Sequence, residues 1–386
     1  MPSERFEPAR LTRAELDEYL ARGWYRIGSQ LITTDFLEWR GQLRSTIWTR
    51  LDLRGHRFKR SLRKLMARNE RQFQVSVGEL VVDRTREQLY ARYRDKVGGE
   101  RVESLEDVLG GEPGRALFDT HEVRVFHGDR LVAFSWFDVG ERSAESVIGV
   151  YDPAFSEYSL GLYTLLLEIR HTAEMGMHFH YAGYVLAEPS AMDYKRRVGN
   201  LQFFDPETRE WLSRSPFDPS RSPAEILRQK LDAAEEALRW AGVGVGRYVN
   251  FLLRDAALLE KYPQYPPQPV LLVCGIPGCS WVVLVAWDPH RGTYRLMSGR
   301  GLAVSFQRGA PVGASHHGWC QVFALGESPG DARAPGSGEA RPPTTVHLFV
   351  VEEQLGERSS AGEIAQLARI HLPRITSRSE SPIGQL

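Results

Sequence analysis

The stretch VYDPAFSEYSLGLYTLLLEIRHTAEMGMHFHYAGYVLAEPSAMDYKRRVGNLQFFDPETREW, residues 150–211, decides the fold. It predicts the end of a strand, a helix, a second strand and a polar loop, an order that builds the floor of a cleft. From Leu160 onward, apolar residues recur at helical spacing, with Ser159 as the expected N-cap and Gly176 as the expected stop. The aromatic-rich run His178–Leu186 predicts the returning strand, and the polar residues after it predict the loop.

Three strand-like runs precede this stretch: Glu122–His127, Arg130–Asp138 and Ser143–Tyr151. The first two are joined by the turn Gly128-Asp129, as expected of a consecutive antiparallel meander. A meander, a helix and a returning strand form an α/β (α+β) arrangement that resembles the GNAT acyltransferase fold. In that arrangement, free N–H groups at the helix N-terminus face the donor, where they suit a phosphate or a developing oxyanion.

Several short sequence words in this stretch resemble one family. They are Asp152-Pro153, Tyr158-Ser159-Leu160-Gly161, Tyr163, Glu168-Ile169, Gly183-Tyr184, Met192 and Tyr194-Lys195. Their order and spacing resemble the C-terminal catalytic domain of the N-end-rule aminoacyl-tRNA–protein transferases, the arginyltransferases and their bacterial leucyl relatives. The resemblance implies an N-degron enzyme with a GNAT-like fold, aminoacyl-tRNA as donor, and an acceptor protein that begins with Asp or Glu.

The N-terminal part of the chain resembles the same family and then departs from it. Residues 15–28, ELDEYLARGWYRIG, resemble the family's entry helix and its RGW-x-R-x-G word. In the family, a pair or cluster of cysteines follows, but residues 29–48 read SQLITTDFLEWRGQLRSTIW and contain none. We therefore expect no thiolate-ligated metal or iron–sulfur site there, and no cofactor or metal elsewhere.

A basic segment comes next, although the whole chain balances 49 basic against 49 acidic residues. Residues 40–71 contain eleven Lys or Arg and two Asp or Glu, with apolar residues interleaved at helical spacing. One face can therefore dock on the body while the other presents cations to phosphates. An ordinary solvated helix face is the alternative, and the resemblance favours tRNA binding. The candidate tRNA-binding residues are Arg57, Lys59, Arg60, Arg63 and Lys64.

The chemistry implied by the resemblance is attack of an acceptor α-amine on the ester that joins an amino acid to tRNA. Such a transfer needs alignment, a proton acceptor and one stabilised oxyanion, without a covalent enzyme intermediate. The N–H groups near Gly161 would face the ester, Lys195 and Arg196 would hold an acidic side chain or a phosphate, and the tyrosines would position the amine, stack on a base or simply pack. The candidate catalytic residues are Tyr158, Ser159, Gly161, Tyr184, Tyr194 and Lys195.

Histidines and one aspartate admit both functional and structural interpretations. His178 and His180 share one face of the predicted strand, and His171 lies on the helix before it, so a metal pair or a proton acceptor is conceivable. Isolated histidines at a sheet surface are more often structural, and we favour that interpretation. Asp152 is expected to cap the turn at Pro153 as readily as to act as a base.

The 386 residues, of which 42% are hydrophobic, can form two or three cores. We expect an N-terminal module with the basic segment (1–98), a GNAT-like catalytic domain (112–214), a helical linker (222–261) and a β-rich C-terminal domain of unknown role (270–386). The linker should hold helices at 224–241 and 247–259, and residues 328–343 form a low-complexity loop.

Cysteine usage and the start of the chain predict a soluble, cytoplasmic protein. The chain has three cysteines, Cys274, Cys279 and Cys320. An odd number of cysteines in a long chain favours reduced thiols over a disulfide framework. With His290, His316 and His317 they match no tight zinc spacing. The charged start resembles no signal peptide, and no apolar run approaches the ~20 residues that a membrane span requires.

Two other functional classes stay open. An acyl-CoA enzyme would need a Q/R-x-x-G-x-G/A loop before the helix, and SEYSLGLY, residues 156–163, lacks that spacing. A non-catalytic tRNA- or protein-binding descendant fits the missing cysteines and the unplaced C-terminal region. The sequence does not identify the donor amino acid. Family usage alone favours arginine over leucine.

Overall fold

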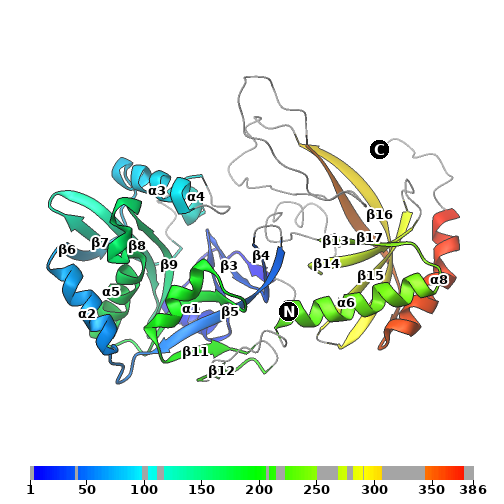
Figure 1. Cartoon of the computed structure of the whole chain (residues 1–386), viewed down its shortest axis with the longest axis horizontal. Helices are drawn as coiled ribbons and strands as arrows, with labels where there is room; N and C mark the ends of the chain where they lie inside the picture. The colour runs from blue at the N-terminus through cyan, green and yellow to red at the C-terminus, as the bar shows by residue number, and fades with distance from the viewer. Residues whose placement is uncertain are drawn as a thin grey trace. The chain divides into compact units, whose positions relative to one another are not determined.

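The computed structural model describes residues 4–39, 42–97, 103–110, 117–205, 208–213, 222–249, 268–275, 281–289, 291–306 and 344–377. The chain forms two compact units (Figure 1), one spanning residues 3–222 and the other residues 223–386. Both mix helices with sheets, so the expected α/β class is confirmed at that level. Among the described helices, none is long and apolar enough to cross a membrane.

A nine-stranded mixed sheet is the framework of the first unit. Its predicted meander is present as antiparallel neighbours β7 (Thr120–His127), β8 (Arg130–Val139) and β9 (Ser143–Tyr151). Across the sheet, the order is β12 (Trp211–Leu212), β11 (Leu201–Phe204), β5 (Gln42–Asp52), β10 (Phe179–Leu186), β9, β8, β7 and β6 (Gln74–Glu79), and β4 (Phe36–Trp39) pairs with β5.

The strands β9 and β10 are parallel, and their register runs only from Ser143↔Phe179 to Glu145↔Tyr181. On its other edge, β10 pairs with β5 in antiparallel fashion along its whole length, with a bulge between Tyr181 and Gly183. The strands β9 and β10 therefore part after three residue pairs. In open α/β sheets, ligands commonly bind beyond the carboxyl ends of strands where neighbours diverge.

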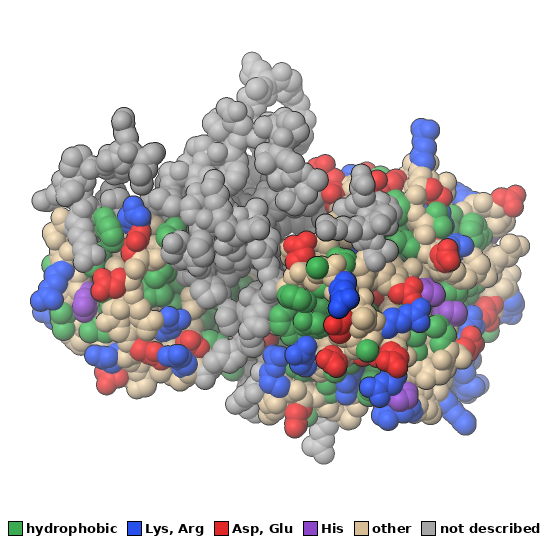
Figure 2. Space-filling model, turned by 180° about the vertical axis from the view of Figure 1, so that it is seen from behind, with side chains coloured by type: hydrophobic (Ala, Val, Ile, Leu, Met, Phe, Trp, Pro, Cys, Tyr) green, Lys and Arg blue, Asp and Glu red, His purple; other side chains and the backbone are tan. Residues whose placement is uncertain are grey.

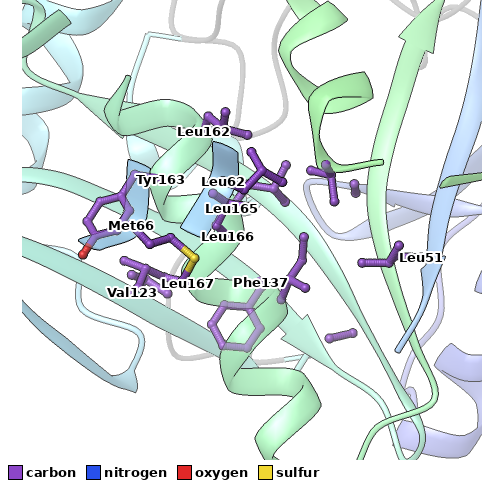
Figure 3. Close-up of a cluster of buried hydrophobic side chains, with 14 of the residues drawn as sticks. Leu51, Leu62, Met66, Val123, Phe137, Leu162, Tyr163, Leu165, Leu166 and Leu167 are labelled. Carbon is purple, nitrogen blue, oxygen red and sulfur yellow. The ribbon is translucent and has the colours of Figure 1, made fainter. Parts of the chain in front are cut away.

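The predicted helix is α5 (Leu160–Glu174), which connects β9 to β10. It lies in the main core, where Leu165, Leu166 and Ile169 are almost fully buried. Figure 3 shows its leucines meeting Leu62 and Met66 from the basic segment. Truncating one such leucine to alanine typically costs about 2–5 kcal/mol, so this packing fixes the helix on the sheet.

The basic segment contains α2 (Arg60–Glu70), and its docking matches the expected amphipathic pattern. Leu62 and Met66 face the core, where they are 2% and 6% exposed. At the other end of the helix, Asn69 Nδ2 donates a hydrogen bond of 2.9 Å to the carbonyl oxygen of Tyr158, just before α5. The segment is thereby fixed against the start of α5.

The place of the family's cysteines is occupied by strand and turn. β3 (Gln30–Thr33) lies between β1 (Glu4–Phe6) and β2 (Tyr25–Ile27) in a small sheet. The turn after β3 is held by hydrogen bonds from Thr46 Oγ1 and Trp48 Nε1 to the carbonyl oxygen of Thr34, at 2.7 and 3.1 Å. Short helices complete the unit: α1 (Arg13–Ala21), α3 (Arg84–Val97), α4 (Leu105–Leu109), η1 (Pro153–Tyr158) and η2 (Ala191–Val198).

Among its described residues, the second unit has an antiparallel sheet and the helices α6 and α8, which contact each other and β15. Its strands follow in chain order, and its elements are α6 (Pro223–Trp240), β13 (Val245–Val249), β14 (Val270–Cys274), β15 (Trp281–Asp288), β16 (Thr293–Phe306), β17 (Thr344–Arg358) and α8 (Ala361–Thr376). The helix expected at 224–241 is confirmed as α6. The helix expected at 247–259 is wrong at its start, because Arg247–Val249 pair with Val270–Leu272; residues 250–267 lie outside the described ones.

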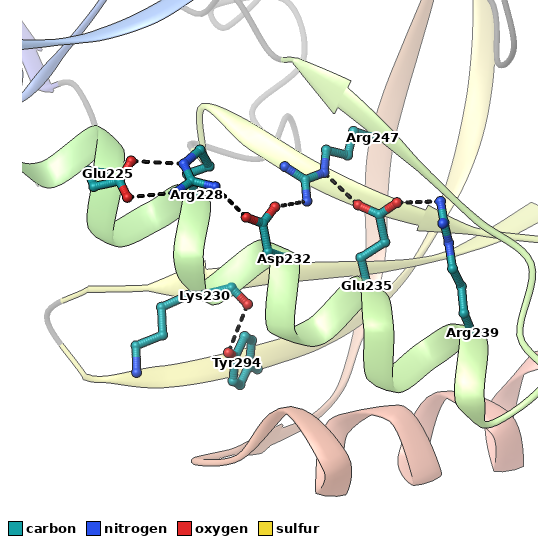
Figure 4. A network of polar contacts seen from close by, with 8 residues as sticks. All are labelled: Glu225, Arg228, Lys230, Asp232, Glu235, Arg239, Arg247 and Tyr294. Carbon is teal, nitrogen blue, oxygen red and sulfur yellow. Dashed lines mark hydrogen bonds and ion pairs between the residues drawn. The ribbon is translucent and has the colours of Figure 1, made fainter. Parts of the chain in front are cut away.

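Ion pairs tie β13 to α6 (Figure 4). Arg247 contacts both Asp232 and Glu235 of the helix, and its Nε lies 2.6 Å from Glu235 Oε2. The same two carboxylates also bind Arg228 and Arg239 within the helix. Since these groups are half-buried or exposed, the network contributes modestly to stability. These ion pairs help to hold Arg247, and with it β13, beside α6.

The expected domain boundaries can be compared with these units. The modules expected at 1–98 and 112–214 share one sheet, because β5 pairs with β10 and β6 pairs with β7. The linker expected at 222–261 contributes α6 and β13 to the same unit as the β-rich region. The low-complexity loop, residues 328–343, lies outside the described residues.

Candidate functional site

Gly183 and Lys195 meet where β9 and β10 part. Gly183 has φ +80°, and a β-carbon placed on it would lie 2.9 Å from Lys195 Nζ. Lys195 Nζ also lies 5.5 Å from the centre of the Tyr184 ring. A side chain at position 183 would therefore both strain the backbone and displace the amine. Gly183-Tyr184 and Tyr194-Lys195, two of the short motifs that carry the family resemblance, therefore contact each other through the Lys195 side chain.

The segment that carries Lys195 was expected to be a loop and is instead the 3-10 helix η2. Ser190 Oγ accepts a hydrogen bond from the N–H of Met192 at 3.1 Å, and Asp193 Oδ2 accepts one from the N–H of Ser190 at 2.9 Å. This reciprocal cap begins the helix at Ala191. The cap fixes the backbone of η2, from which the Lys195 side chain extends to Gly183 in the sheet.

Burial lowers the pKa of Lys195 to about 8, against the opposing effect of two nearby carboxylates, Glu168 and Glu145. Glu168 comes from α5 and Glu145 from β9. An amine in a desolvated setting loses its proton more readily, and a neighbouring negative charge favours retaining it. Lys195 therefore titrates near neutral pH, unlike an ordinary surface lysine.

Glu145 is 3% exposed and is held by the N-terminal part of the chain. Its carboxylate oxygens accept the backbone N–H of Arg26 at 3.2 and 3.3 Å. The Arg26 guanidinium, also buried, donates to Asp138 at 2.9 Å. Burial, and then repulsion from Asp138, raise the pKa of Glu145 well above its ordinary value. The second arginine of the word RGWYRIG thus anchors the carboxyl group beside Lys195.

A second buried network lies around Glu168, which contacts the hydroxyl of Ser146. His180 is fully buried, with Nε2 3.0 Å from Ser146 Oγ and Nδ1 3.3 Å from Thr172 Oγ1. Its Nε2 is also 3.5 Å from Glu168 Oε2. Both ring nitrogens of His180 therefore have partners inside the protein, which supports a structural role that orients Glu168.

A small pocket lies beside Glu145 and Gly183. It holds about 10 Å³ of space, room for about one water molecule, and is lined by Leu20, Gly23, Trp24, Tyr25, Trp48, Thr49, Glu145, Tyr181, Gly183 and Trp211. Among these lining residues, Glu145 is the one acidic residue. Tyr25 stacks on Trp48 with ring centres 3.6 Å apart. The arrangement is an aromatic-walled recess with a carboxyl group and the Gly183 backbone at its boundary.

The predicted residues at the start of α5 form a separate group. Ser159 occupies the N-cap position, as expected, but adopts a left-handed conformation (φ 51°, ψ 45°), and its side chain makes no capping hydrogen bond. Tyr158 packs edge-on against Phe73, with ring centres 5.0 Å apart. Gly161 faces Tyr151, whose ring lies 3.3 Å from a β-carbon placed there. A non-glycine residue in left-handed geometry costs about 1–3 kcal/mol, a strain that often marks functional sites.

The predicted residues around β10 and η2 come together more closely. Tyr184 meets Trp48 edge-on with ring centres 5.4 Å apart, next to Lys195. Tyr194 is partly buried against the main core. Arg196 donates to Asp193 at 3.2 Å and to the carbonyl oxygen of Leu186 at 2.8 Å, so this guanidinium holds η2 against the end of β10.

All five candidate tRNA-binding cations are exposed. Within the part of the chain that the structure describes, none of their side chains takes part in an ion pair or hydrogen bond. The first turn of α2 contains no acidic residue, and Lys59 is its N-cap. Cations at the positive end of a helix are unfavourable unless an anion binds there. Elsewhere, Figure 2 shows basic and acidic side chains intermingled, in keeping with the balanced composition.

Sequence reasoning missed Glu145, Arg26, Asp138 and Trp48. One signal was available in the sequence: Glu145 lies within the strand-like run SAESVIGVY, residues 143–151. A charged side chain that is buried in a sheet needs a partner. Arg26 lay within a recognised word but had no assigned role. The partner of each could not be named, since they belong to segments far apart in the sequence.

Metal ligands form no cluster of three or more among the described residues. Cys274 is buried and unpaired, and burial raises the pKa of its thiol to about 12. Cys279, Cys320, His290, His316 and His317 lie outside the described residues. His178, just before β10, and His171, on α5, are both partly buried.

Residues 85–205 match the model of the family described as "Arginine-tRNA-protein transferase, C terminus". The resemblance inferred from the sequence is thereby confirmed. It covers β7 to β10, α5 and η2, and so includes Glu145, Gly183 and Lys195.

Curated relatives carry a leucyltransferase name. An aspartate/glutamate leucyltransferase from Hyphomonas neptunium is 30% identical over 164 residues, which are 40% of this chain and 64% of the relative. One from Xanthomonas oryzae pv. oryzae is 29% identical over 171 residues, 42% of this chain and 66% of the relative. This chain therefore spans somewhat less than two thirds of each relative.

Among solved structures, the C-terminal domain of a putative lysylphosphatidylglycerol synthetase from Agrobacterium fabrum is similar, with 17% identity and a TM-score of 0.31. The likeness covers 36% of this chain and 46% of that one.

Proposed function

We propose that the protein is an aminoacyl-tRNA–protein transferase, which moves an amino acid from tRNA to the N-terminal amine of an acceptor protein. The observation that carries this proposal is the junction of β9 and β10. There a titratable amine and a buried carboxyl group come together within the stretch that matches the transferase family, beside a small pocket lined mostly by residues outside that stretch.

The fold suggests how the donor is held. In a GNAT-type arrangement, the ester lies near the N-terminus of the helix between the parting strands, which here is α5. The first N–H groups of a helix have no acceptor within it and suit a developing oxyanion. We assign this role to the backbone at Leu160 and Gly161, with the strained Ser159 setting their direction. Tyr184 and Tyr194 then flank the acceptor amine, whereas the packing of Tyr158 favours a structural role.

The tRNA would lie along the N-terminal end of α2. Arg57, Lys59, Arg60, Arg63 and Lys64 present unpaired cations there, and α2 is fixed beside the start of α5 by Asn69. Phosphates neutralised by these side chains release counterions, so affinity should fall steeply with salt. Asn69 fixes the C-terminal end of α2 beside the start of α5, so the proposed tRNA path runs along α2 toward the helix that faces the ester.

Two donor amino acids are supported by different observations. Arginine is supported by the chemistry of the pocket lining, because Glu145 is its one acidic residue and aromatic side chains favour a guanidinium. Leucine is supported by the names of the curated relatives. We favour arginine, with leucine as the second candidate.

The acceptor proposed is a protein that begins with Asp or Glu, in line with the names of the relatives. Addition of the new residue would create an N-degron for protein degradation in the cytoplasm. Exposed cations near the site, Arg197 of η2 among them, would attract an acidic N-terminus.

The test is a transfer assay with the full-length chain. Arginyl-tRNA and leucyl-tRNA, each charged with a labelled amino acid, are offered with peptides that begin with Asp, Glu or Ala. We expect labelled product from arginyl-tRNA with the Asp and Glu peptides and none with the Ala peptide. Product from leucyl-tRNA alone would correct the donor. Absence of product with every charged tRNA, together with salt-sensitive tRNA binding, would overturn the enzyme and favour a binding descendant.

A further inference from the structure

We propose that Lys195 accepts the proton of the attacking α-amine and returns it to the departing ribose oxygen, with Glu145 as its positioning partner. The inference rests on the proposed function, because it concerns the same transfer. It adds the identity of the group that moves the proton. Neither the family match nor the relatives assign such a role to any residue of this chain.

The position of Lys195 is built into the backbone. The bulge before Gly183 interrupts the pairing of β10 with β5, and the positive φ of Gly183 turns the chain away from the incoming side chain. Thr49 Oγ1 donates a 2.8 Å hydrogen bond to the Gly183 carbonyl oxygen, which holds this geometry. The space beside Gly183 is occupied by Lys195 Nζ, since a β-carbon there would lie only 2.9 Å away.

A small pocket borders this position. Its lining includes Gly183, which contacts Lys195, and Glu145, which acts on Lys195 electrostatically; Lys195 itself is not a lining residue. The proposal places the neutral acceptor amine on the pocket side of Gly183, where it would reach Lys195.

The surroundings of Lys195 suit a group that alternates between amine and ammonium. Glu145 on β9 and Glu168 on α5 stabilise the ammonium form, whereas burial stabilises the amine. The ammonium in turn acts to lower the pKa of Glu145, against the burial and the Asp138 charge that raise it. The balance brings the pKa of Lys195 to about 8, close to the optimum for a base that works near neutral pH. The charged or titratable groups that face these residues include Tyr181 and Tyr184 on β10, Tyr25 and Arg26 on β2, Asp138 on β8, and His180 behind Glu168.

The step balances without any further reactant. The neutral acceptor nitrogen attacks the ester carbonyl carbon, a C–N bond forms, and the carbonyl electron pair moves to oxygen. Lys195 in its amine form takes the proton from the now positive nitrogen and becomes an ammonium beside Glu145 and Glu168. The oxygen pair then re-forms the carbonyl, the C–O bond to the ribose breaks, and the ribose oxygen takes the proton from Lys195. Ester and amine become amide and alcohol.

The first experiment compares Lys195→Ala with Lys195→Arg in the full-length chain, in single-turnover transfer to an Asp-peptide. We expect both variants to lose about 10²- to 10⁴-fold in rate, because arginine keeps the charge but does not release a proton. Binding of charged tRNA should change by no more than about twofold, and thermal unfolding confirms that each variant is folded. A Lys195→Arg variant with wild-type rate would overturn the proposal, since Lys195 would then only hold an anion.

A second measurement keeps the proposal testable if both variants are slow for structural reasons. Methylamine or ethylamine in the assay should restore peptide product for Lys195→Ala, in proportion to the added amine, and not for Lys195→Arg, in which the guanidinium fills the space. Peptide product is scored, because free amines also cleave the ester directly. A folded Lys195→Ala variant that no amine rescues would contradict the role of base.

The part played by Glu145 is tested by Glu145→Gln, which keeps an oxygen for the Arg26 N–H. Glu145 raises the pKa of Lys195, so its removal should move the rise of rate with pH to lower pH. The ratio of variant to wild-type rate on the same peptide cancels the titration of the peptide amine. An unmoved profile would remove Glu145 from the proposal. A wild-type chain that transfers from no charged tRNA would instead overturn the proposed function itself.

Discussion

Gly183 illustrates how much of the site depends on single residues. It combines a left-handed backbone with a close approach of Lys195 Nζ, and either feature alone would favour glycine. Gly128, in the turn between β7 and β8, has a similar backbone (φ +58°) but no atom within 4 Å of a β-carbon placed on it. The two glycines therefore separate backbone strain from displacement of the lysine.

This difference predicts the outcome of two matched substitutions. Gly128→Ala and Gly183→Ala should each destabilise the protein by about 1–2 kcal/mol, because both place a β-carbon in left-handed geometry. Only Gly183→Ala should also lower the transfer rate, by at least tenfold, since it moves Lys195. Urea unfolding and the peptide transfer assay measure the two effects. Equal activity of the two variants would show that the contact with Lys195 is unimportant.

Residue identities were readable from the sequence where a word was distinctive, as for Gly183 and Lys195. Their partners were not, because contacts such as Arg26 with Asp138 join segments more than a hundred residues apart. Tyr158 shows the opposite failure. It lies within a family word, yet its ring packs on Phe73 and its carbonyl oxygen accepts from Asn69. A word alone does not distinguish a residue that holds the site together from one that contacts substrate.

At the scale of elements, α5 and α2 were predictable because each has a clear apolar face that the core then covers. β13 was not, since Arg247–Val249 pair with Val270–Leu272 and Arg247 binds Asp232 and Glu235. Such long-range pairing overrides local preference. η2 was missed for another reason: the capping pair Ser190 and Asp193 was visible in the sequence but was assigned to a loop.

The cations of α2 lead to a prediction about the element as a whole. Arg60→Ala with Arg63→Ala should weaken tRNA binding and make the slope of log affinity against log salt shallower by up to ~2 units. Both side chains are exposed, so the melting temperature should change little.

The matched control is Arg84→Ala with Lys96→Ala, two exposed cations of α3. It removes the same charge from the same unit and should leave the salt slope unchanged. Filter binding of charged tRNA over a series of salt concentrations provides the slopes. Equal slopes for the two double variants would locate the tRNA elsewhere.

At the scale of the whole molecule, the residues of the candidate site all belong to the unit formed by residues 3–222. The described part of the second unit has a sheet, the helices α6 and α8, and its own buried core around Leu271, Leu284 and Ala286. Composition indicated more than one core, but the grouping of β5 and β6 with the meander depended on strand pairing that no local pattern reveals.

This division predicts that residues 1–222 produced alone will fold and retain transfer. Far-ultraviolet circular dichroism and cooperative urea unfolding would report folding, and the peptide assay would report activity within about tenfold of the full chain. A shortened chain that folds cooperatively and binds tRNA but transfers nothing would show that the second unit takes part in the reaction.

The strand β5 has a consequence for the order of events during synthesis. It enters the sheet between β10 and β11, so that Asp52 pairs with Phe179 and Leu51 with Leu201. At about 5–20 residues per second, the ribosome delivers those partners on the order of ten seconds after β5. Throughout that interval, an eleven-residue strand with buried Ile47 and Leu51 has only β4 to pair with. Nascent chains of this protein should therefore depend on chaperones that shield exposed strands more than a chain with sequential pairing would.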